Sequence, residues 1–204
     1  MPSHRQLVHP CRRGFTLIEF MVTLAVAAIL LGLAVPSFRT FIQNSRLQAP
    51  ATDLLHAIQL ARTEAIKRQQ NVVVCASTDS SSANASCSGG DFTSGWIVFA
   101  DDGPAPDWQR QPSETLISTH SNVDSGVNIK SDNDHIVAYA SNGFPASPGA
   151  SGKTPTANIS ICDSRGNVAS AGTQSVARAI LVDPRIGRAV ESNLIADVAN
   201  AGGC

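Results

Sequence analysis

Charged residues are scarce in this chain, because Asp, Glu, Lys and Arg together make up 15% of its 204 residues. The formal net charge is −1. Without the three basic residues before Gly14, which are Arg5, Arg12 and Arg13, 12 basic residues face 16 acidic ones and the charge becomes −4. A mildly acidic body argues against broad, non-specific binding of nucleic acid.

The chain also lacks the short motifs that mark common catalytic sites. It contains no G-x-S-x-G, no phosphate-binding P-loop and no H-E-x-x-H. Its histidines lie near the N-terminus, on a predicted helix, or apart from any nucleophile motif, and many of its serines lie in loops of low complexity. We therefore predict that the protein is not an enzyme and needs no cofactor.

Closely spaced cysteine pairs are missing as well. No C-x-x-C occurs and no histidine lies at ligand spacing, so a zinc site is disfavoured. Cys11 lies near the N-terminus, and the other four cysteines form an even set that is typical of a disulfide framework in an oxidising compartment. Four cysteines permit three connectivities. We favour Cys75–Cys87, which closes a short Ser-rich loop, and Cys162–Cys204, which joins the C-terminal end to a predicted strand.

One acidic segment is the remaining candidate for a metal. Residues 101–107 contain three carboxylates, Asp101, Asp102 and Asp107. Oxygen-rich loops of this kind hold calcium in some proteins. Asp, Gly and Pro are also the residues that any turn requires, so we favour an ordinary turn and predict no metal site.

What the chain has in excess is one long apolar run. Phe15–Val35 contains a single charged residue, Glu19. As a helix that rises about 1.5 Å per residue, this run would span roughly 31 Å, the thickness of one hydrocarbon core. A secretory signal has a shorter apolar stretch and a small-residue cleavage site after it, whereas Pro36 and Ser37 follow here. We predict a membrane helix over residues 15–36, with the preceding basic residues in the cytoplasm and the rest of the chain across the membrane.

The junction before this run is its most specific feature. Gly14-Phe15-Thr16-Leu17-Ile18-Glu19 resembles the class III signal of type IV prepilins and type II secretion pseudopilins. The resemblance implies that a prepilin peptidase removes the leader 1–14 by cutting after Gly14, and that Phe15 is then N-methylated. It also implies that the new amine of Phe15 pairs with Glu19 of a neighbouring filament subunit and sets the axial register, as buried polar groups can. The competing interpretation is that Glu19 lies close enough to the membrane interface to reach water.

The remainder of the chain predicts an α+β fold. Apolar residues recur at spacings of three and four from Leu54 to Ile66, which indicates an amphipathic helix over 37–69 with a kink or break near Pro50. Trp96 and Phe99 would lie on opposite faces of one strand, one in the core and one half-buried. The β-rich domain over 70–204 is predicted from these short, often β-branched segments: Asn71–Ala76, Gly95–Ala100, Thr115–Thr119, Val127–Lys130, His135–Ala140, Asn158–Asp163 and Val176–Asp183.

Several short patterns in the domain resemble one branch of the pilin family. They are Val74-Cys75, Gly95–Asp101, Ser141-Asn142-Gly143, Ile159–Cys162 and Gly187-Arg188, in the order found in the minor subunits FimT and FimU of type IV pili and GspH of type II secretion. The resemblance implies a pilin fold, with the long N-terminal helix packed on an antiparallel β-sheet domain. It also implies a minor pilin or pseudopilin that primes or caps filament assembly, in the bacterial inner membrane and then at the filament tip. Its partners would be other minor and major pilins, a prepilin peptidase and the inner-membrane assembly platform.

Three arginines, Arg178, Arg185 and Arg188, suggest an alternative function, which is the binding of DNA. In some FimT subunits a C-terminal G-R-x-R motif binds DNA during natural transformation, but here no second arginine follows Arg188 at that spacing. Arg185 would lie near Arg188 across a turn, Arg178 precedes both, and the guanidinium fork suits phosphate. The alternative is therefore a DNA-binding tip subunit that serves DNA uptake. The competing interpretation is surface charge paired with two flanking acids, Asp183 and Glu191.

Overall fold

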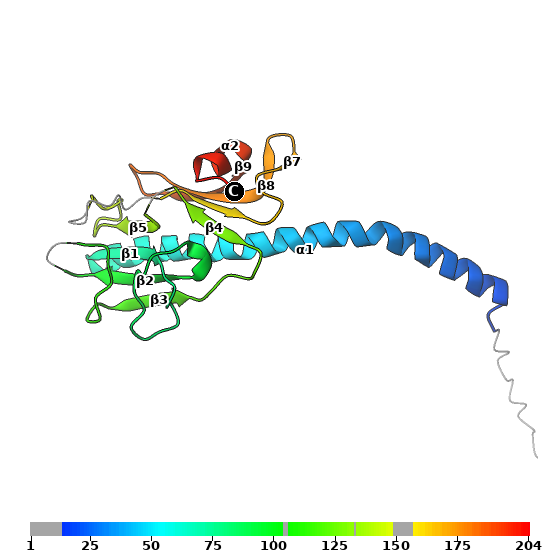
Figure 1. The fold of residues 1–204 in the computed structure, drawn as a ribbon, viewed down its shortest axis with the longest axis horizontal. Coiled ribbons are helices and arrows are strands. Elements are labelled where there is room, and N and C mark those ends of the chain that lie inside the picture. Colours follow the sequence, from blue (N-terminus) through cyan, green and yellow to red (C-terminus); the bar gives the residue numbers. More distant parts are fainter. Residues whose placement is uncertain (1–13, 104–105, 133, 149–156) are drawn as a thin grey trace, which may run out of the picture. The chain divides into compact units, whose positions relative to one another are not determined.

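The computed structural model describes residues 14–103, 106–132, 134–148 and 157–204. The predicted leader, residues 1–14, lies outside this part of the chain except for Gly14. Backbone contacts divide the chain into two compact units, Met1–Ile42 and Gln43–Cys204. Figure 1 shows the order of the elements along the chain.

One long helix, α1, runs from Leu17 to Arg68. It is long and apolar enough to cross a membrane, as judged by length and composition. In the first unit the described side chains from Gly14 to Ile42 are all exposed. This half of the helix therefore has no core of its own within the chain.

The predicted break at Pro50 is absent, because α1 continues through this residue. Proline removes one helical hydrogen bond and crowds the preceding turn. Leu47, Ala51 and Leu54 surround it in sequence and are all fully buried. Tertiary packing of an apolar face contributes most of the stability of a helix in a protein, and here it outweighs the local cost of the proline.

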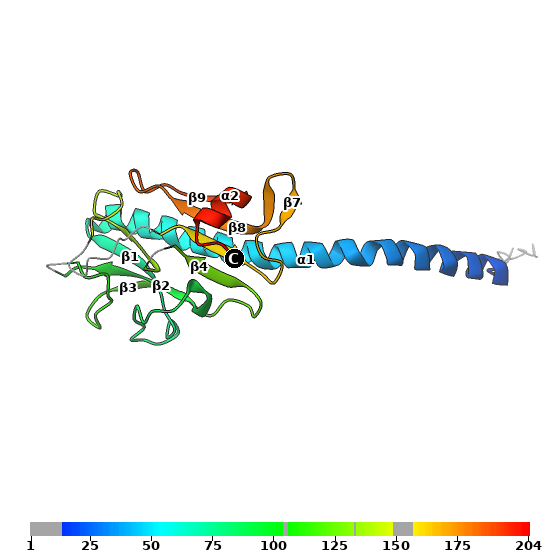
Figure 2. The same ribbon diagram turned by 45° about the horizontal axis from the view of Figure 1, so that its top comes forward.

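Two antiparallel sheets make up most of the second unit, and the C-terminal half of α1 runs alongside them (Figures 1 and 2). The first sheet has the order β3-β2-β1-β5 and the second has the order β4-β6-β8-β7, with β9 also paired to β8. The bounds of the first sheet are β1 Asn71–Ala76, β2 Trp96–Asp101, β3 Leu116–His120 and β5 Ile136–Tyr139. Those of the second are β4 Asn128–Ser131, β6 Ile159–Cys162, β7 Ala169–Ala171, β8 Gln174–Val182 and β9 Ala189–Leu194. A short 3-10 helix, η1, covers Phe92–Ser94, and α2 covers Ile195–Asn200.

Strand β2 is buried on both faces. Trp96 packs with α1 and both sheets in the main core, whereas Phe99 packs in a second core that includes Trp108 and Ala85. The prediction that one of the two aromatic residues would be half-buried is therefore wrong, since Trp96 and Phe99 are 2% and 0% exposed. The segments that contain Ala85 and Trp108 cover the outer face of this sheet.

The predicted α+β class, a long N-terminal helix with antiparallel sheets, is confirmed by these elements. All seven predicted strands are present, with ends that differ by at most two residues. The sequence analysis did not predict β7, β9, α2 or the short helix η1. Strands β7 and β9 both pair with β8, and this pairing sets their structure more than their own composition does.

Candidate functional site

The N-terminal junction lies at the start of α1. Phe15 precedes the helix and its side chain is 84% exposed. The backbone N–H of Glu19 donates to Oγ1 of Thr16 at 3.3 Å, so Thr16 caps the first turn. Thr16 and Glu19 form the T-x-x-E pattern of a capping box, a signal for a helix start that is visible in the sequence and that our sequence prediction did not include. Glu19 therefore occupies the helix N-terminus, where a carboxylate is favoured by the helix dipole.

A largely apolar surface follows this junction along α1, with Arg39 as the one charged residue between Phe20 and Phe41. Large apolar side chains are exposed on several sides of the helix; they include Leu17, Ile18, Phe20, Met21, Leu24, Ile29, Leu30, Leu31, Leu33, Phe38 and Phe41. Exposed apolar area of this extent marks a surface that lipid or another protein covers. The arrangement suits membrane insertion and helix packing, and it offers no catalytic group.

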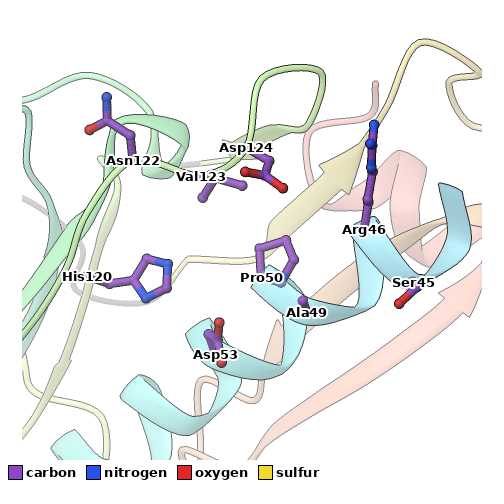
Figure 3. A pocket seen from close by; sticks show the side chains of 9 residues that line it. All are labelled: Ser45, Arg46, Ala49, Pro50, Asp53, His120, Asn122, Val123 and Asp124. Atoms are coloured by element: carbon purple, nitrogen blue, oxygen red, sulfur yellow. The ribbon is translucent and has the colours of Figure 1, made fainter. Parts of the chain in front are cut away.

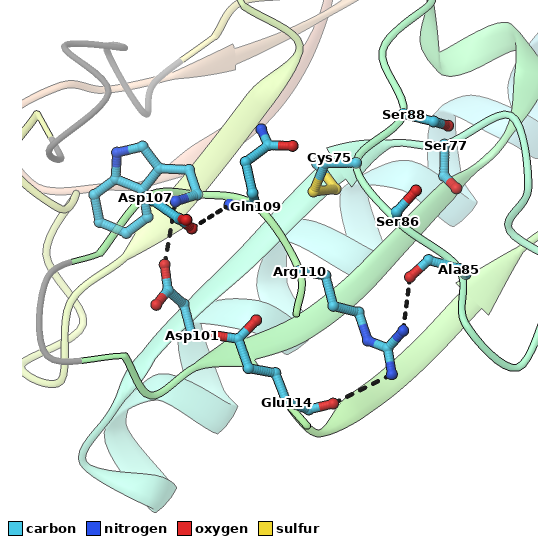
Figure 4. The surroundings of a disulfide bond; sticks show 12 residues. Cys75, Ser77, Ala85, Ser86, Ser88, Asp101, Asp107, Gln109, Arg110 and Glu114 are labelled. Atoms are coloured by element: carbon cyan, nitrogen blue, oxygen red, sulfur yellow. Dashed lines mark hydrogen bonds between the residues drawn. A yellow bond between two sulfur atoms is a disulfide. The ribbon is translucent and has the colours of Figure 1, made fainter. Parts of the chain in front are cut away.

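Two disulfides are present in the second unit. Cys75 in β1 is joined to Cys87 with an S–S distance of 2.03 Å, and Cys162 in β6 is joined to Cys204 at 1.96 Å. Figure 4 shows the surroundings of the first. It closes the Ser-rich segment that follows β1, and the second attaches the residues after α2 to the second sheet.

The Ser-rich segment after β1 is held by more than its disulfide. The carboxylate of Asp79 accepts hydrogen bonds from the backbone N–H of Ser86 at 3.0 Å and from the hydroxyl of Ser77 at 2.8 Å. The backbone bond from Ser86 lowers the pKa of Asp79. Arg110 donates to the carbonyl of Ala85 at 2.7 Å and so ties this segment to the loop before β3 (Figure 4).

In the acidic segment that was the candidate calcium site, the carboxylate of Asp101 is hydrogen-bonded to the backbone. The carboxylate of Asp101 accepts the N–H of Trp108 at 3.2 Å, and burial raises the pKa of Asp101. Within the described ranges, no group of three or more His, Cys, Asp or Glu residues is placed to hold a metal ion. Asp101 thus has a structural partner of its own in the loop.

The three candidate arginines do not form one cluster. Arg178 lies within β8, where its Nε donates to Oε1 of Gln48 at 3.1 Å and pairs with Oε1 of Glu191 at 3.3 Å. Arg185 and Arg188 lie beyond β8, in the turn that leads to β9, and both are exposed. Roughly 13 Å of strand separates Arg178 from the end of β8.

The competing interpretation is met in part. Within the described ranges neither turn arginine forms an ion pair with a flanking acid, but the charge of Arg185 contributes to the lowered pKa of Asp183. Glu191 is engaged by Arg178. The carboxylate of Asp183 accepts the backbone N–H of Arg185 at 2.8 Å and of Ile186 at 3.2 Å, and these bonds lower the pKa of Asp183. Among the described residues, no carboxylate lies within ion-pair distance of the guanidinium of Arg185 or Arg188.

The turn is fixed to the first sheet by Tyr139. Its buried hydroxyl donates to the carbonyl of Gly187 at 2.8 Å. Gly187 has φ +66°, and a Cβ there would lie 2.7 Å from the Tyr139 ring. Only glycine fits this conformation and this close approach.

Replacing Gly187 by alanine should destabilise the domain by about 1–3 kcal/mol, because the new methyl group strains the backbone and meets the ring. Urea unfolding, followed by tryptophan fluorescence, measures the loss. Gly166→Ala is the matched control, since Gly166 also has positive φ (+70°) but no atom lies within 4 Å of its added Cβ. An equal loss in both variants would mean that backbone strain alone acts and that contact with Tyr139 contributes nothing.

A separate pocket of about 350 Å³ lies between α1 and the segment after β3 (Figure 3). Arg46, Asp53, His120 and Asp124 line it together with two polar and three apolar residues: Ser45, Asn122, Ala49, Pro50 and Val123. The His120 ring stacks on Trp96 with a centroid distance of 3.9 Å. Because the lining carries one arginine and two carboxylates, the pocket does not select a ligand of one charge.

The chain matches two known protein families. Residues 10–35 match the prokaryotic N-terminal methylation motif, and residues 51–184, about two thirds of the chain, match the family described as type II transport protein GspH. The chain belongs to this GspH family. The protein is therefore a minor pilin or pseudopilin of a type II secretion or type IV pilus system, a structural subunit and not an enzyme. Membership implies assembly with other pilins and processing by a prepilin peptidase.

Two crystal structures of the type IV minor pilin FimU from Pseudomonas aeruginosa resemble the chain. One is 17% identical, covers 74% of this chain and 90% of its own, and has a TM-score of 0.49. The other, from a second crystal form, is 16% identical, covers 72% and 92%, and has a TM-score of 0.48. No curated protein sequence matches the chain significantly.

Proposed function

We propose that the protein is a minor subunit that primes or caps the assembly of a type IV pilus or type II secretion pseudopilus. Cleavage after Gly14 would expose the amine of Phe15, whose partner in the filament is Glu19 of the next subunit. The first part of α1 would span the inner membrane with the N-terminus in the cytoplasm and the second unit in the periplasm. On assembly, the subunit would move to the filament tip.

The observation that carries this proposal is the exposed apolar half of α1, with Glu19 in its first turn. No other part of the described chain covers the described side chains of this half. In the rest of α1, one face is buried in the main core of the second unit. A helix with this surface is stable in lipid and can exchange lipid for the helices of other subunits, which involves little change in the polarity of its surroundings. Movement from membrane to filament requires such an exchange.

The test is a deletion mutant scored for surface filaments, secreted enzymes and transformation in parallel. Loss of filaments or of secretion, restored by the intact gene, is the expected result. Filaments and secretion at the level of the parent strain would contradict a role in assembly. Which of the two outputs fails also assigns the filament type.

The turn after β8 supports a second candidate function, binding of DNA by a tip subunit. Arg185 and Arg188 are exposed, and among the described residues neither forms an ion pair, although the charge of Arg185 acts on Asp183 at longer range. Guanidinium groups placed in this way suit phosphate oxygens. Arg178 is engaged by Gln48 and Glu191, so we omit it from this surface.

If this second function holds, the full chain in detergent micelles should retard DNA in a gel at low salt, and the double variant Arg185→Ala, Arg188→Ala should bind about tenfold more weakly. Removing two phosphate contacts should also reduce the salt dependence of binding. Lys130→Ala, which removes an exposed charge from β4, is the control. Binding that is absent, or that both variants weaken equally, would rule out this turn as a DNA site.

A further inference from the structure

A pocket of about 460 Å³ lies where the second half of α1 meets the turn between β8 and β9. Among the described residues, the charged ones that line it are two arginines, Arg62 from α1 and Arg188 from the turn. The ring of Tyr139 and the side chain of Val190 form apolar walls. We call this site the arginine pocket. Both arginines belong to the second unit, so the site lies within one compact body.

The two charges in the arginine pocket are not neutralised by the part of the chain that the structure describes. Neither Arg62 nor Arg188 forms an ion pair there. Four other cations of the same unit are paired: Lys67 and Arg68 with Glu64, Arg165 with Asp163, and Arg178 with Glu191. Among the described residues, Arg46, Arg110, Lys130 and Arg185 also form no ion pair, so what sets Arg62 and Arg188 apart is that they line one pocket together. Two unpaired guanidinium groups in one pocket favour an anionic ligand locally.

The position of Arg188 in this pocket is fixed by its neighbours. The carbonyl of Arg188 accepts the N–H of Asp183 at 3.0 Å, and the preceding Gly187 receives the hydrogen bond from Tyr139. Burial raises the pKa of Tyr139 to about 12, so its hydroxyl stays protonated and remains a donor at neutral pH. A site whose backbone is already ordered loses less conformational entropy when a ligand binds.

The surroundings of the arginine pocket favour one of the two anionic groups that arginine binds best, which are phosphate and carboxylate. Nucleic acid gains its affinity from a series of phosphate contacts along a basic track. On its other side, however, Arg188 borders a second pocket that contains Asp183 and Asp197, and these carboxylates would repel a polyanion. A single carboxylate on a short aliphatic stem avoids them, and its stem can contact the ring of Tyr139 and the side chain of Val190.

We propose that the arginine pocket binds the carboxylate of a glutamate or aspartate side chain from a protein partner. Arg62 and Arg188 would hold its two oxygens by charge-assisted hydrogen bonds. The turn then serves as a protein contact rather than as part of a DNA track. This proposal goes beyond the assembly function, and a peptide in solution tests it without any filament.

The experiment titrates the full chain in detergent micelles with the peptide acetyl-Ala-Glu-Ala-amide and observes the arginine Nε–Hε signals by NMR. The signals of Arg62 and Arg188, assigned from the variants that lack them, should shift and saturate. The peptide acetyl-Ala-Gln-Ala-amide should leave them unchanged. Arg62→Gln and Arg188→Gln should each weaken binding about tenfold or more, as expected for a lost charge-assisted hydrogen bond.

Arg185→Gln is the matched control, because it removes one arginine from the same turn without touching the lining of the pocket. Binding by this variant should equal that of the parent chain. The proposal fails if no signal saturates, if the glutamine peptide acts equally, or if Arg185→Gln weakens binding as much as Arg188→Gln. It also fails if a single-stranded oligonucleotide shifts the same signals at lower concentration than the glutamate peptide. Should Arg62→Gln lower the thermal stability, the exposed Arg188 alone decides the result.

Discussion

Replacing Glu19 by glutamine is expected to lower the incorporation of this subunit into filaments by about tenfold or more. On the proposed cleavage after Gly14, the charged amine of Phe15 would enter an apolar environment and need an opposite charge. Glutamine keeps the shape of the side chain and suits the N3 position of a capping box, so the first turn of α1 should persist. The measurement compares the amount of subunit in sheared filaments with the amount left in the membrane.

Two controls make the Glu19 experiment specific. Glu19→Asp keeps the charge and should retain a large part of the incorporation, and the size of the mature subunit shows whether the leader was removed. Thr16→Ser keeps the capping hydroxyl and should behave like the parent. Normal incorporation of the Glu19→Gln subunit would contradict the pairing with Phe15 and leave a helix cap as the role of this residue.

Removal of the Cys162–Cys204 disulfide should reduce the free energy of unfolding by about 4 kcal/mol, and removal of Cys75–Cys87 by about 3 kcal/mol, on the basis of loop entropy. The difference arises because the sequence separations are 42 and 12 residues. Both cysteines of a pair are replaced by serine, so that neither partner is left as a free thiol. Urea unfolding monitored by fluorescence is suitable because Trp96 and Trp108 are both buried.

The order of these two effects is the informative result. If loss of Cys75–Cys87 has the larger effect, then contacts around the Ser-rich segment, such as Asp79 with Ser86, depend on that disulfide. Asp79→Asn in the parent chain separates the two contributions, since it weakens those contacts and leaves the sulfur bridge intact. A parent chain that shows no change on reduction would contradict the prediction for both pairs.

The parts of the fold that follow from local pattern were predictable. The apolar run and the buried strands each show their pattern within a few neighbouring residues. The continuity of α1 through Pro50 was not predictable, because it depends on Leu47 and Leu54 being buried against distant strands. Strand β9 was missed for the same reason, since its pairing with β8 sets its conformation more than its own composition does.

The arginine sites show the same limit more sharply. Sequence proximity grouped Arg178 with Arg185 and Arg188, but a β-strand directs Arg178 to Gln48 and Glu191 instead. Arg62 is 126 positions before Arg188 in the sequence, and only the packing of α1 beside the turn brings both into one pocket. No local signal marks such a pair, because each residue alone has the pattern of an ordinary surface charge.

Because the chain is synthesised from its N-terminus, the positions of the four disulfide-bonded cysteines also determine the order in which the two disulfides can form. Cys75 and Cys87 emerge first, and their shorter separation should bring them together about six times as often as Cys162 and Cys204. Once the first pair has closed, Cys162 has no other thiol of the set to meet until Cys204 appears. We expect correct pairing to follow from this order of synthesis, with little need for later exchange between the two bridges.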